Sequence, residues 1–596
     1  MNQKTRTRLL AALVPAACVA AYACKDVLDT QPFGTLNTGT FYVTEKDFLA
    51  ATVGAYVTFQ GLTWSGRDQS LFRAAIYPDD DTRASGSNAE NDFSWTPTNS
   101  NINYPGWEIP YRGILRANLI LEQLEKTDQL TDAQKARFAG EAKFVRAFMY
   151  FQLARFYGTP PVITRVATSV DETKQGNSQP GEVWDLIEAD LEDAIKGLAG
   201  LNMEQGRATE WAARALLGKV ELYRAQWGIK EPPILKGVSP QAKYQEAAAH
   251  LQQVVSSGKF SLVPYENNFK YTTENNAESL FEMQASFGTD INGWAGADEN
   301  GGGASSGSGR ALAFGTGGGP TGTLAPGGYD WGSGNFAITL SLVNEFEKYD
   351  SAQVAVAGSA QQAWAVIRDP RAYFTFYASG ERYGRACGTN PAFYNFRWSC
   401  SGGNTVVGTF SPWSVTGFTA SKYIRPFENF SGGMSLNQSV SQNNERHIRY
   451  ADVLLLLAEA KLLGSNDVAG AAALINQVRA RARAAYDRAY GAGSIDAALY
   501  SGIAQPANLL PDRSAAASPA QMFAWLRHER RVELALEFNR YEDLVRWLRA
   551  GLIQRSDIDF GDNVANSQFD PTKHVLRPIP LGEIDLNPNL HQNPGY

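Results

Sequence analysis

The chain has 596 residues and a formal net charge of −7. This negative charge argues against a nucleic-acid partner, because phosphate backbones are bound by strongly basic surfaces. The length exceeds that of a usual single core, yet no charge run or long proline-rich linker divides the chain. We therefore expect one large composite domain, residues 24–596, behind a short N-terminal segment.

The N-terminal segment has the pattern of a bacterial lipoprotein signal. A basic start (residues 4–8) precedes a nearly apolar run at 9–22, and small residues lead to Cys24. The run is shorter than the roughly 20 residues of a membrane-spanning helix. We expect cleavage after residue 23 and acylation of Cys24, which takes the formal charge to −10 and anchors the domain, because each buried methylene contributes about 0.8 kcal/mol. An ordinary cleaved signal with an incidental cysteine is the alternative.

Two cysteines remain for the folded body, Cys387 and Cys400, in a stretch rich in Gly, Asn and aromatic residues. Outside the cytoplasm we expect them to form a disulfide. Closing so short a loop would contribute on the order of 3 kcal/mol in the chain-entropy model. Two free buried thiols are the alternative.

Helical periodicity dominates residues of about 40–260 and 447–596. Apolar residues from Ile448 to Leu462 recur at spacings of three and four, and a second such series runs from Val468 to Ala482. Further helices are expected at 110–126, 133–157, 181–198, 209–227 and 241–257. Units of this kind resemble degenerate tetratricopeptide hairpins, which stack to bury a continuous core. The predicted fold is therefore mainly α.

Two long insertions interrupt the helical pattern. The larger, at about 260–446, opens with a strand-like stretch at 278–284 and continues through a Gly-, Ser- and Ala-rich stretch at 293–334. The smaller runs from Leu62 to Trp107, with Pro and Asn residues that we expect to exclude a long helix. Long loops on a rigid scaffold are usually functional or disordered, so function is sought here.

Several distinct motifs follow one another along nearly the whole chain. They are Val27 to Pro32, Phe41-Tyr42, Thr44 to Asp47, Ala55-Tyr56, Gly140 to Phe151, Arg155 to Gly158, Arg368 to Arg371, Arg449 to Val453, Asn476 to Arg479, Glu529 to Leu534, Ile579-Pro580 and Gln592 to Tyr596. In this order they resemble the SusD/RagB family of outer-membrane nutrient-binding lipoproteins. The resemblance implies a SusD-like fold and a cell-surface receptor, lipid-anchored in the outer membrane. It also implies that the receptor is seated on a SusC-like, TonB-dependent barrel transporter. The ligand is an oligosaccharide or, in the RagB branch, a peptide.

Ligand residues of this family lie on variable loops, so the site must be predicted from chemistry. A glycan site needs exposed aromatic rings for sugar faces and polar side chains for hydroxyls. In the smaller insertion Trp64, Trp95 and Tyr104 supply the rings, accompanied by Asn99, Asn101 and Asp92. The larger insertion supplies Trp294, Tyr329 and Trp331. The alternative is that each ring only anchors its own loop, which is the better interpretation for Trp107.

Two charged motifs have competing interpretations. The triplet Asp79 to Asp81 could bind calcium, but it follows Pro78 without a spaced ligand series and is interpreted as a solvated turn. The alternating Glu and Arg residues between Glu529 and Arg540 could suggest acid–base catalysis. We favour an ion-pair network that joins the last helices to their neighbours.

Enzyme signatures are weak. Gly303 to Gly307 satisfies the nucleophile-elbow pattern in low-complexity sequence without a preceding strand, and the five histidines are scattered. We predict a non-enzymatic binding protein without metal or cofactor. A surface-anchored hydrolase with paired carboxylates and a subunit that only caps a transporter are the alternatives.

Overall fold

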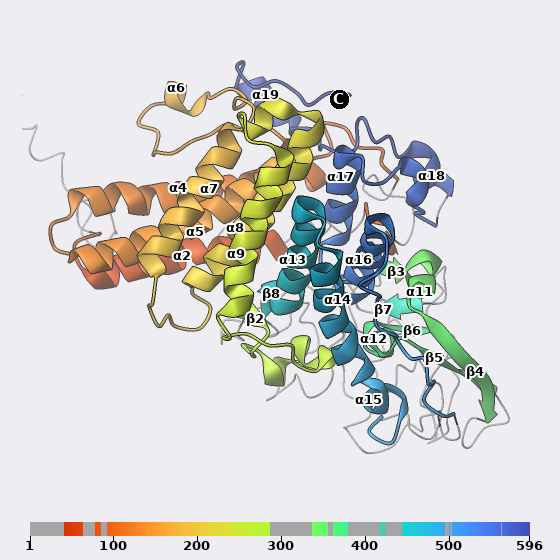
Figure 1. Ribbon diagram of the computed structural model, residues 1–596. Coiled ribbons are helices and arrows are strands. Elements are labelled where there is room, and N and C mark those ends of the chain that lie inside the picture. The colour runs from red at the N-terminus through yellow and green to blue at the C-terminus, as the bar shows by residue number, and fades with distance from the viewer. Residues whose placement is uncertain are drawn as a thin grey trace, which may run out of the picture.

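The computed structural model describes residues 41–63, 78–84, 92–285, 336–355, 362–378, 418–420, 422, 444–494, 500, 503–561 and 563–596. Helices dominate (Figure 1), as the periodicity predicts. The long helices are α2 (Glu45–Thr63), α4 (Ser100–Lys126), α5 (Asp132–Tyr157), α7 (Glu182–Leu198), α8 (Glu210–Lys230), α9 (Pro240–Ser256), α13 (Tyr450–Ser465), α14 (Val468–Arg483), α16 (Pro519–Glu533) and α17 (Arg540–Ala550). The shorter helices are α6 (Val170–Thr173), α11 (Leu340–Glu345), α12 (Pro370–Thr375), α15 (Tyr486–Tyr490), α18 (Asn563–Gln568) and α19 (Leu581–Leu586).

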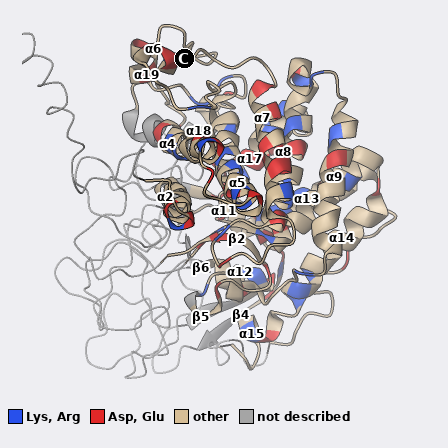
Figure 2. Ribbon diagram, turned by 90° about the vertical axis from the view of Figure 1, so that its left-hand side faces the viewer, with Lys and Arg blue, Asp and Glu red and all other residues tan. Residues whose placement is uncertain are grey.

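The predicted hairpins form a continuous stack. From α4 to α9 each long helix packs against the next, and α13 packs against α9 and α14. Because α9 precedes the larger insertion and α13 follows it, the insertion leaves the stack and returns without interrupting it. Residues of both charge signs lie along α7, α8 and α9 (Figure 2). Asp193 of α7 pairs with Lys143 of α5 at 2.6 Å, and Glu188 of α7 pairs with Lys243 of α9 at 2.9 Å.

Local sequence explains where the stacked helices begin and end. Thr131 and Gln134 form a reciprocal capping box at the start of α5, and Ser239 with Pro240 starts α9. Asn466, in the left-handed region at φ 54°, ends α13 between the two predicted apolar series. Gly551 ends α17 in the same way at φ 70°.

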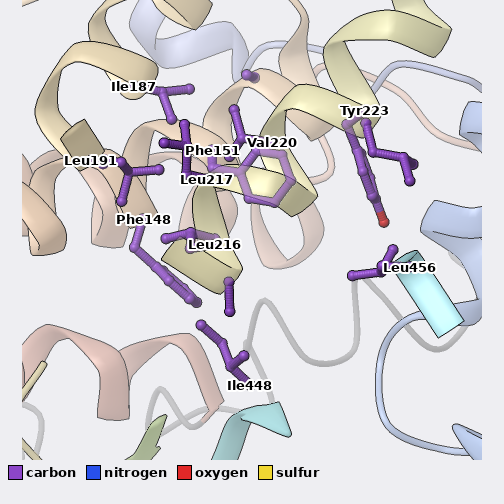
Figure 3. Packing of buried hydrophobic residues seen from close by; sticks show 14 of the residues in the cluster. Phe148, Phe151, Ile187, Leu191, Leu216, Leu217, Val220, Tyr223, Ile448 and Leu456 are labelled. Carbon is purple, nitrogen blue, oxygen red and sulfur yellow. The ribbon is translucent and has the colours of Figure 1, made fainter. Parts of the chain in front are cut away.

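The core of the stack is apolar and closely packed. Phe148 and Phe151 of α5 lie beside Leu216 and Leu217 of α8 in the same buried cluster (Figure 3). Tyr223 packs edge-on against Phe151 with ring centroids 5.2 Å apart. Helix α5 is buried on nearly all sides, which explains why its apolar residues do not form a single stripe.

Helix α4 differs from its prediction. It begins at Ser100, about ten residues earlier than expected, and both Pro105 and Pro110 lie within it. A proline inside a helix removes one backbone hydrogen bond and crowds the carbonyl four residues earlier, so the local sequence argues against a helix here although one forms. The smaller insertion therefore ends before Trp107.

Strands are short and confined to the insertions and their ends. They are β1 (Thr82–Ala84), β2 (Ser279–Met283), β3 (Phe336–Ile338), β4 (Lys348–Ala355), β5 (Gln362–Arg368), β6 (Phe376–Ala378), β7 (Phe418–Ala420) and β8 (Glu445–Arg449). The predicted strand at 278–284 is confirmed as β2, which pairs antiparallel with β8. This pair joins the two ends of the larger insertion beside the stack. Among the described residues, no helix has the length and apolar character of a membrane span.

Candidate functional site: the loop-bearing sheet

A four-stranded antiparallel sheet brings the two insertions together. Its order is β1-β3-β7-β6, and β1 belongs to the smaller insertion whereas the other strands belong to the larger. Ala84, the last residue of β1, pairs with Phe336, the first residue of β3. Phe336 stands only five positions after Trp331 in the sequence. We call this unit the loop-bearing sheet, because the sequence stretches predicted to bind ligand lead into or out of its strands.

Asp80 and Asp81 attach the loop-bearing sheet to α16 and α17. Arg531 Nε donates to Asp81 Oδ1 at 2.8 Å, and Arg540 donates to both Asp80 carboxylate oxygens at 2.6 and 2.7 Å. Thr339, just after β3, donates from its N–H to Asp81 O and from its hydroxyl to Asp80 O, at 3.0 and 2.7 Å. The same triplet therefore holds β1, β3 and the last helices in one arrangement.

The interpretation of Asp79 to Asp81 as a solvated turn is wrong, because the three residues are at most 4% exposed. The guanidinium groups of Arg531 and Arg540 outweigh the opposing effect of burial and lower the pKa of Asp80. Burial and the neighbouring carboxylates of Asp81 and Asp80 raise the pKa of Asp79 instead. Among the described residues, no group of three or more His, Cys, Asp or Glu side chains has the arrangement of a metal site.

Arg371, in α12, is the centre of a second set of buried ion pairs. Its guanidinium donates to Asp369 Oδ2 at 2.6 Å, to Glu529 Oε1 at 2.6 Å and to Glu533 Oε2 at 2.9 Å, and all four side chains are fully buried. Because α12 leads directly into β6, these pairs fix the far edge of the loop-bearing sheet to α16.

Lys422, two residues beyond β7, is fixed in the same way. Its ammonium donates to Glu537 Oε1 at 2.6 Å and lies 4.3 Å from the ring centroid of Phe269. Glu537 also accepts from Arg449, the last residue of β8, at 2.6 and 2.8 Å. Burial lowers the pKa of Lys422 to about 8, although Glu537 opposes this shift.

His528 joins α16 to α11, the helix that follows β3. Its Nδ1 lies 2.7 Å from Glu345 Oε1, and Arg531 Nη1 lies 3.2 Å from Glu345 Oε2. Burial alone would lower the pKa of His528, but hydrogen bonds to Glu345 and Glu347 raise it to about 9. His528 is therefore a cation at neutral pH and completes the attachment of β3.

The predicted ion-pair network between Glu529 and Arg540 is confirmed. Glu533 is bound by Arg371, Arg449 and Arg481, and these cations lower its pKa against the opposing effect of burial. Arg530 binds Asp452 and Asp543 at 2.9 and 2.8 Å. Buried carboxylates held ionised in this way are poorly suited to exchange protons with a substrate. We conclude that the network positions the loop-bearing sheet.

Trp95 is the predicted site residue that the structure contradicts. It is 1% exposed, its ring lies 5.3 Å from that of His574, and Arg577 lies 4.8 Å from its centroid. Phe93 packs beside it at 5.4 Å, so residues 93–95 return to the core instead of projecting from it. The interpretation of Trp107 as an anchor is confirmed, because it is 5% exposed.

The other predicted residues stay predictions. Asn101 and Tyr104 lie in the first two turns of α4, and their side chains are outside the described part of the structure. Asn99 accepts hydrogen bonds from the N–H and hydroxyl of Thr96, both at 2.6 Å, in a local turn. The remaining candidates lie outside the described residues: Cys24, Trp64, Trp294, Tyr329, Trp331, Cys387 and Cys400.

The importance of Asp80, Arg371 and Lys422 was missed by the sequence interpretation. A signal for Arg371 existed, because it stands in the motif Arg368 to Arg371 that carries the family resemblance. A signal for Asp80 also existed, since three consecutive carboxylates need cations if they are buried. Lys422 has no comparable signal, because it belongs to none of the motifs that carry the family resemblance.

Two family models match the chain. The model of the SusD family matches residues 277–596, more than half of the chain, and a model described as starch-binding associating with outer membrane matches residues 66–222. Both matches include strands of the loop-bearing sheet.

Individual proteins are also similar. A SusD-like protein of Bacteroides ovatus is 28% identical over 299 residues, which span 48% of this chain and about half (50%) of that protein. SusD-like protein P2 of Formosa agariphila is 24% identical over 96% of this chain and 97% of its own length. A solved structure of a laminarin-binding SusD-like protein has a TM-score of 0.64, with 22% identity and coverage of 93% of this chain and 100% of that one. The mainly helical architecture is therefore that of SusD-like proteins, and the chain belongs to the SusD family of non-catalytic, outer-membrane-associated glycan-binding proteins.

Proposed function

We propose that the protein captures an oligosaccharide or polysaccharide at the cell surface and delivers it to a SusC-like TonB-dependent transporter. Acylated Cys24 anchors it in the outer membrane. The observation that carries this proposal is the loop-bearing sheet, which joins the two aromatic-rich insertions into one unit fixed to α16. The sheet holds together the residues that flank the aromatic side chains of the smaller and the larger insertion. A glycan platform requires such a rigid support.

The ligand contacts are assigned to Trp64, Asn101, Tyr104, Trp294, Tyr329 and Trp331. Aromatic faces stack on the apolar faces of sugar rings, and burying one such side chain contributes roughly 1.5 to 3 kcal/mol, more than a single hydrogen bond of about 1 kcal/mol. The family membership and the laminarin-binding neighbour support a glycan as the ligand. Laminarin is therefore the first polysaccharide to test.

Affinity electrophoresis in gels containing laminarin or starch tests the proposal. We expect retardation of the purified mature chain, and a reduced retardation for Trp331→Ala and Trp64→Ala. Trp211→Ala is the matched control, because Trp211 lies at the start of α8, outside both insertions. Equal mobility of all variants across a panel of glycans would remove the proposed platform. Binding of casein peptides without glycan binding would favour the RagB-like alternative, and release of shorter sugars would contradict a binding-only role.

The anchor and the transporter are tested in cells. Cys24→Ser should release the protein from the outer-membrane fraction. A tagged wild-type chain, solubilised from that fraction with mild detergent, should co-purify a TonB-dependent barrel. Recovery of the wild-type protein in the soluble fraction would contradict the anchor, and recovery without any barrel would contradict the delivery step.

A further inference from the structure

A cavity of about 460 Å³ lies far along the chain from the predicted aromatic platform. It is lined by the C-terminal ends of α8 and α17, by residues of the segments 551–555 and 571–576, and by Pro594. In Figure 1, α17 and α19 lie near the C terminus of the chain, whereas β3, β6 and β7 lie at the lower right. The volume falls in the range of roughly 300–1000 Å³ that small-molecule sites occupy.

The charge of this cavity contrasts with that of the whole chain. Its lining contains four cations, Lys230, Arg549, Arg555 and Lys573, and one carboxylate, Glu231. Arg549 is paired with Glu231 and lies 3.9 Å from the ring centroid of Trp227. Within the described residues, no ion pair joins Lys230, Arg555 or Lys573 to a carboxylate. A chain with a net charge of −7 thus places three cations that have no ion-pair partner among the described residues around one cavity.

The three cations are held in place by neutral groups. Lys230 donates to Leu548 O at 3.2 Å, and Arg555 donates to Ile558 O at 3.0 Å. The ammonium of Lys573 lies 4.5 Å from the ring centroid of Tyr596. None of these contacts is an ion pair, although burial lowers the pKa of Arg555 and the nearby carboxylate of Asp559 opposes that shift. A charged ligand would therefore meet ordered cations, with Lys230 and Lys573 as its main partners. The carbonyl of Leu548, near the end of α17, already accepts from Lys230 and from the Gly551 N–H.

The rest of the lining is suited to a sugar ring. Leu548, Ile553, Val575 and Leu576 provide apolar surface for the ring face, and Thr572 and Gln554 provide hydrogen-bonding groups. We propose that this cavity is a second saccharide site, specific for a sugar that carries a carboxylate, sulfate or phosphate group. The inference shares with the proposed function only the class of ligand, because it requires neither the insertions nor their aromatic residues.

Calorimetric titration of the full mature chain with trigalacturonate at low ionic strength tests this site. We expect Lys573→Glu to weaken binding about tenfold or more, because it replaces an attractive charge with a repulsive one. Lys573→Arg should retain most of the affinity, and added NaCl should reduce the wild-type affinity. Lys46→Glu, an exposed substitution in α2, is the matched charge control and should have no effect. Absence of binding to any acidic sugar tested, or an equal loss in Lys573→Glu and Lys46→Glu, would overturn the inference.

Further titrations distinguish where the acidic sugar comes from, and distinguish the cavity from the aromatic platform. Sulfated carrageenan oligosaccharides represent a nutrient, and a phosphorylated core oligosaccharide of lipopolysaccharide represents the membrane surface. Binding of either that depends on Lys573 supports the site and identifies its source. Titration with neutral laminarin oligosaccharides reports on the aromatic platform alone, so Lys573→Glu should leave it unchanged. Loss of laminarin binding in that variant would show that the cavity and the platform are not separate.

Discussion

Helix α5 in the stack and β3 in the loop-bearing sheet are fixed by different interactions. Phe148, Phe151 and their neighbours hold α5 by apolar packing on nearly every side. Strand β3 has three residues, and its surroundings are fixed through Asp80, Asp81 and Arg371, which are all at most 1% exposed. Short strands bury too little apolar surface to define their own position. Directional ion pairs with residues of α16 and α17 supply that definition. This region should therefore depend on charge more than the stack, where buried pairs such as Arg146–Asp190 only add to the apolar packing.

The largest expected effect concerns Trp95, an aromatic residue of the smaller insertion that behaves as part of the stack's core. Trp95→Ala should lower the free energy of unfolding by about 3–5 kcal/mol, because it leaves a large cavity. Urea denaturation followed by fluorescence measures this change. Trp331→Ala is the comparison and should leave the unfolding free energy within about 0.5 kcal/mol. A stable Trp95→Ala protein with reduced glycan affinity would restore the original interpretation of Trp95 as a ligand residue.

Arg371→Met should cost a similar amount, about 3–5 kcal/mol, by a different mechanism. The substitution leaves Asp369, Glu529 and Glu533 buried with one cation fewer. Arg371 helps to lower the pKa of Glu529 and of Glu533 against the opposing effect of burial, so both pKa values should rise in the variant. The cost should therefore fall at low pH, where the variant can protonate these carboxylates more easily than the wild type can. Leu217→Ala in the stack, expected at 2–5 kcal/mol, should show no such pH dependence. Parallel unfolding curves at pH 4 and pH 7 distinguish the two mechanisms, and identical pH profiles would contradict them.

Arg531→Gln should loosen the loop-bearing sheet more than the molecule as a whole. The change removes the cation that binds Asp81 and Glu345. We expect faster amide hydrogen exchange at 82–84 and 336–338, with at least a tenfold increase in local opening. Arg224→Gln is the matched control, because Arg224 is also buried but pairs with Asp185 and Glu188 in the stack. Unchanged exchange in the sheet would show that the ion pairs do not position it.

The pH dependence of the same region follows from His528. Because its pKa is raised to about 9, its stabilisation is complete below the unfolded value of about 6.5 and is lost as the pH rises through 9. The partner Glu345 has its pKa lowered to about 2, since His528 and Arg531 outweigh burial, so its contribution is lost only in strong acid. His528→Gln should therefore destabilise by about 2 kcal/mol at pH 7 and by little at pH 10. A constant difference between pH 7 and pH 10 would contradict this linkage.

The sequence predicts the stack better than it predicts the loop-bearing sheet, because the stack depends on local signals and the sheet on long-range contacts. Spacings of three and four from Ile448 to Leu462 are local signals, so the helices of the stack are predicted to within a few residues, apart from the start of α4. The attachment of Asp80 to Arg540 spans 460 positions, and no local pattern encodes it. Trp95 shows the limit for the site: an aromatic ring has the same sequence appearance whether it contacts ligand or the core. The composition of the insertions predicts where to look, but the burial of each ring depends on long-range contacts.

Glu221 is a buried carboxylate of the stack that differs from the buried carboxylates near α16. Those carboxylates are paired with arginines, whereas the nearest basic group to Glu221 is His250. Glu221 of α8 is 4% exposed, its Oε2 accepts no hydrogen bond, and His250 Nε2 lies 3.5 Å from Oε1. Burial, followed by the charge of Glu188, raises the pKa of Glu221 well above 4.5. A raised acid pKa stabilises the fold at low pH and loses that contribution as the pH rises above 4.5. Glu221→Gln should therefore increase the free energy of unfolding by about 1 kcal/mol at pH 8 and have no effect near pH 4. Thermal unfolding at both pH values measures the difference, and a destabilised variant at pH 8 would mean that a cation compensates the charge of Glu221 in the folded protein.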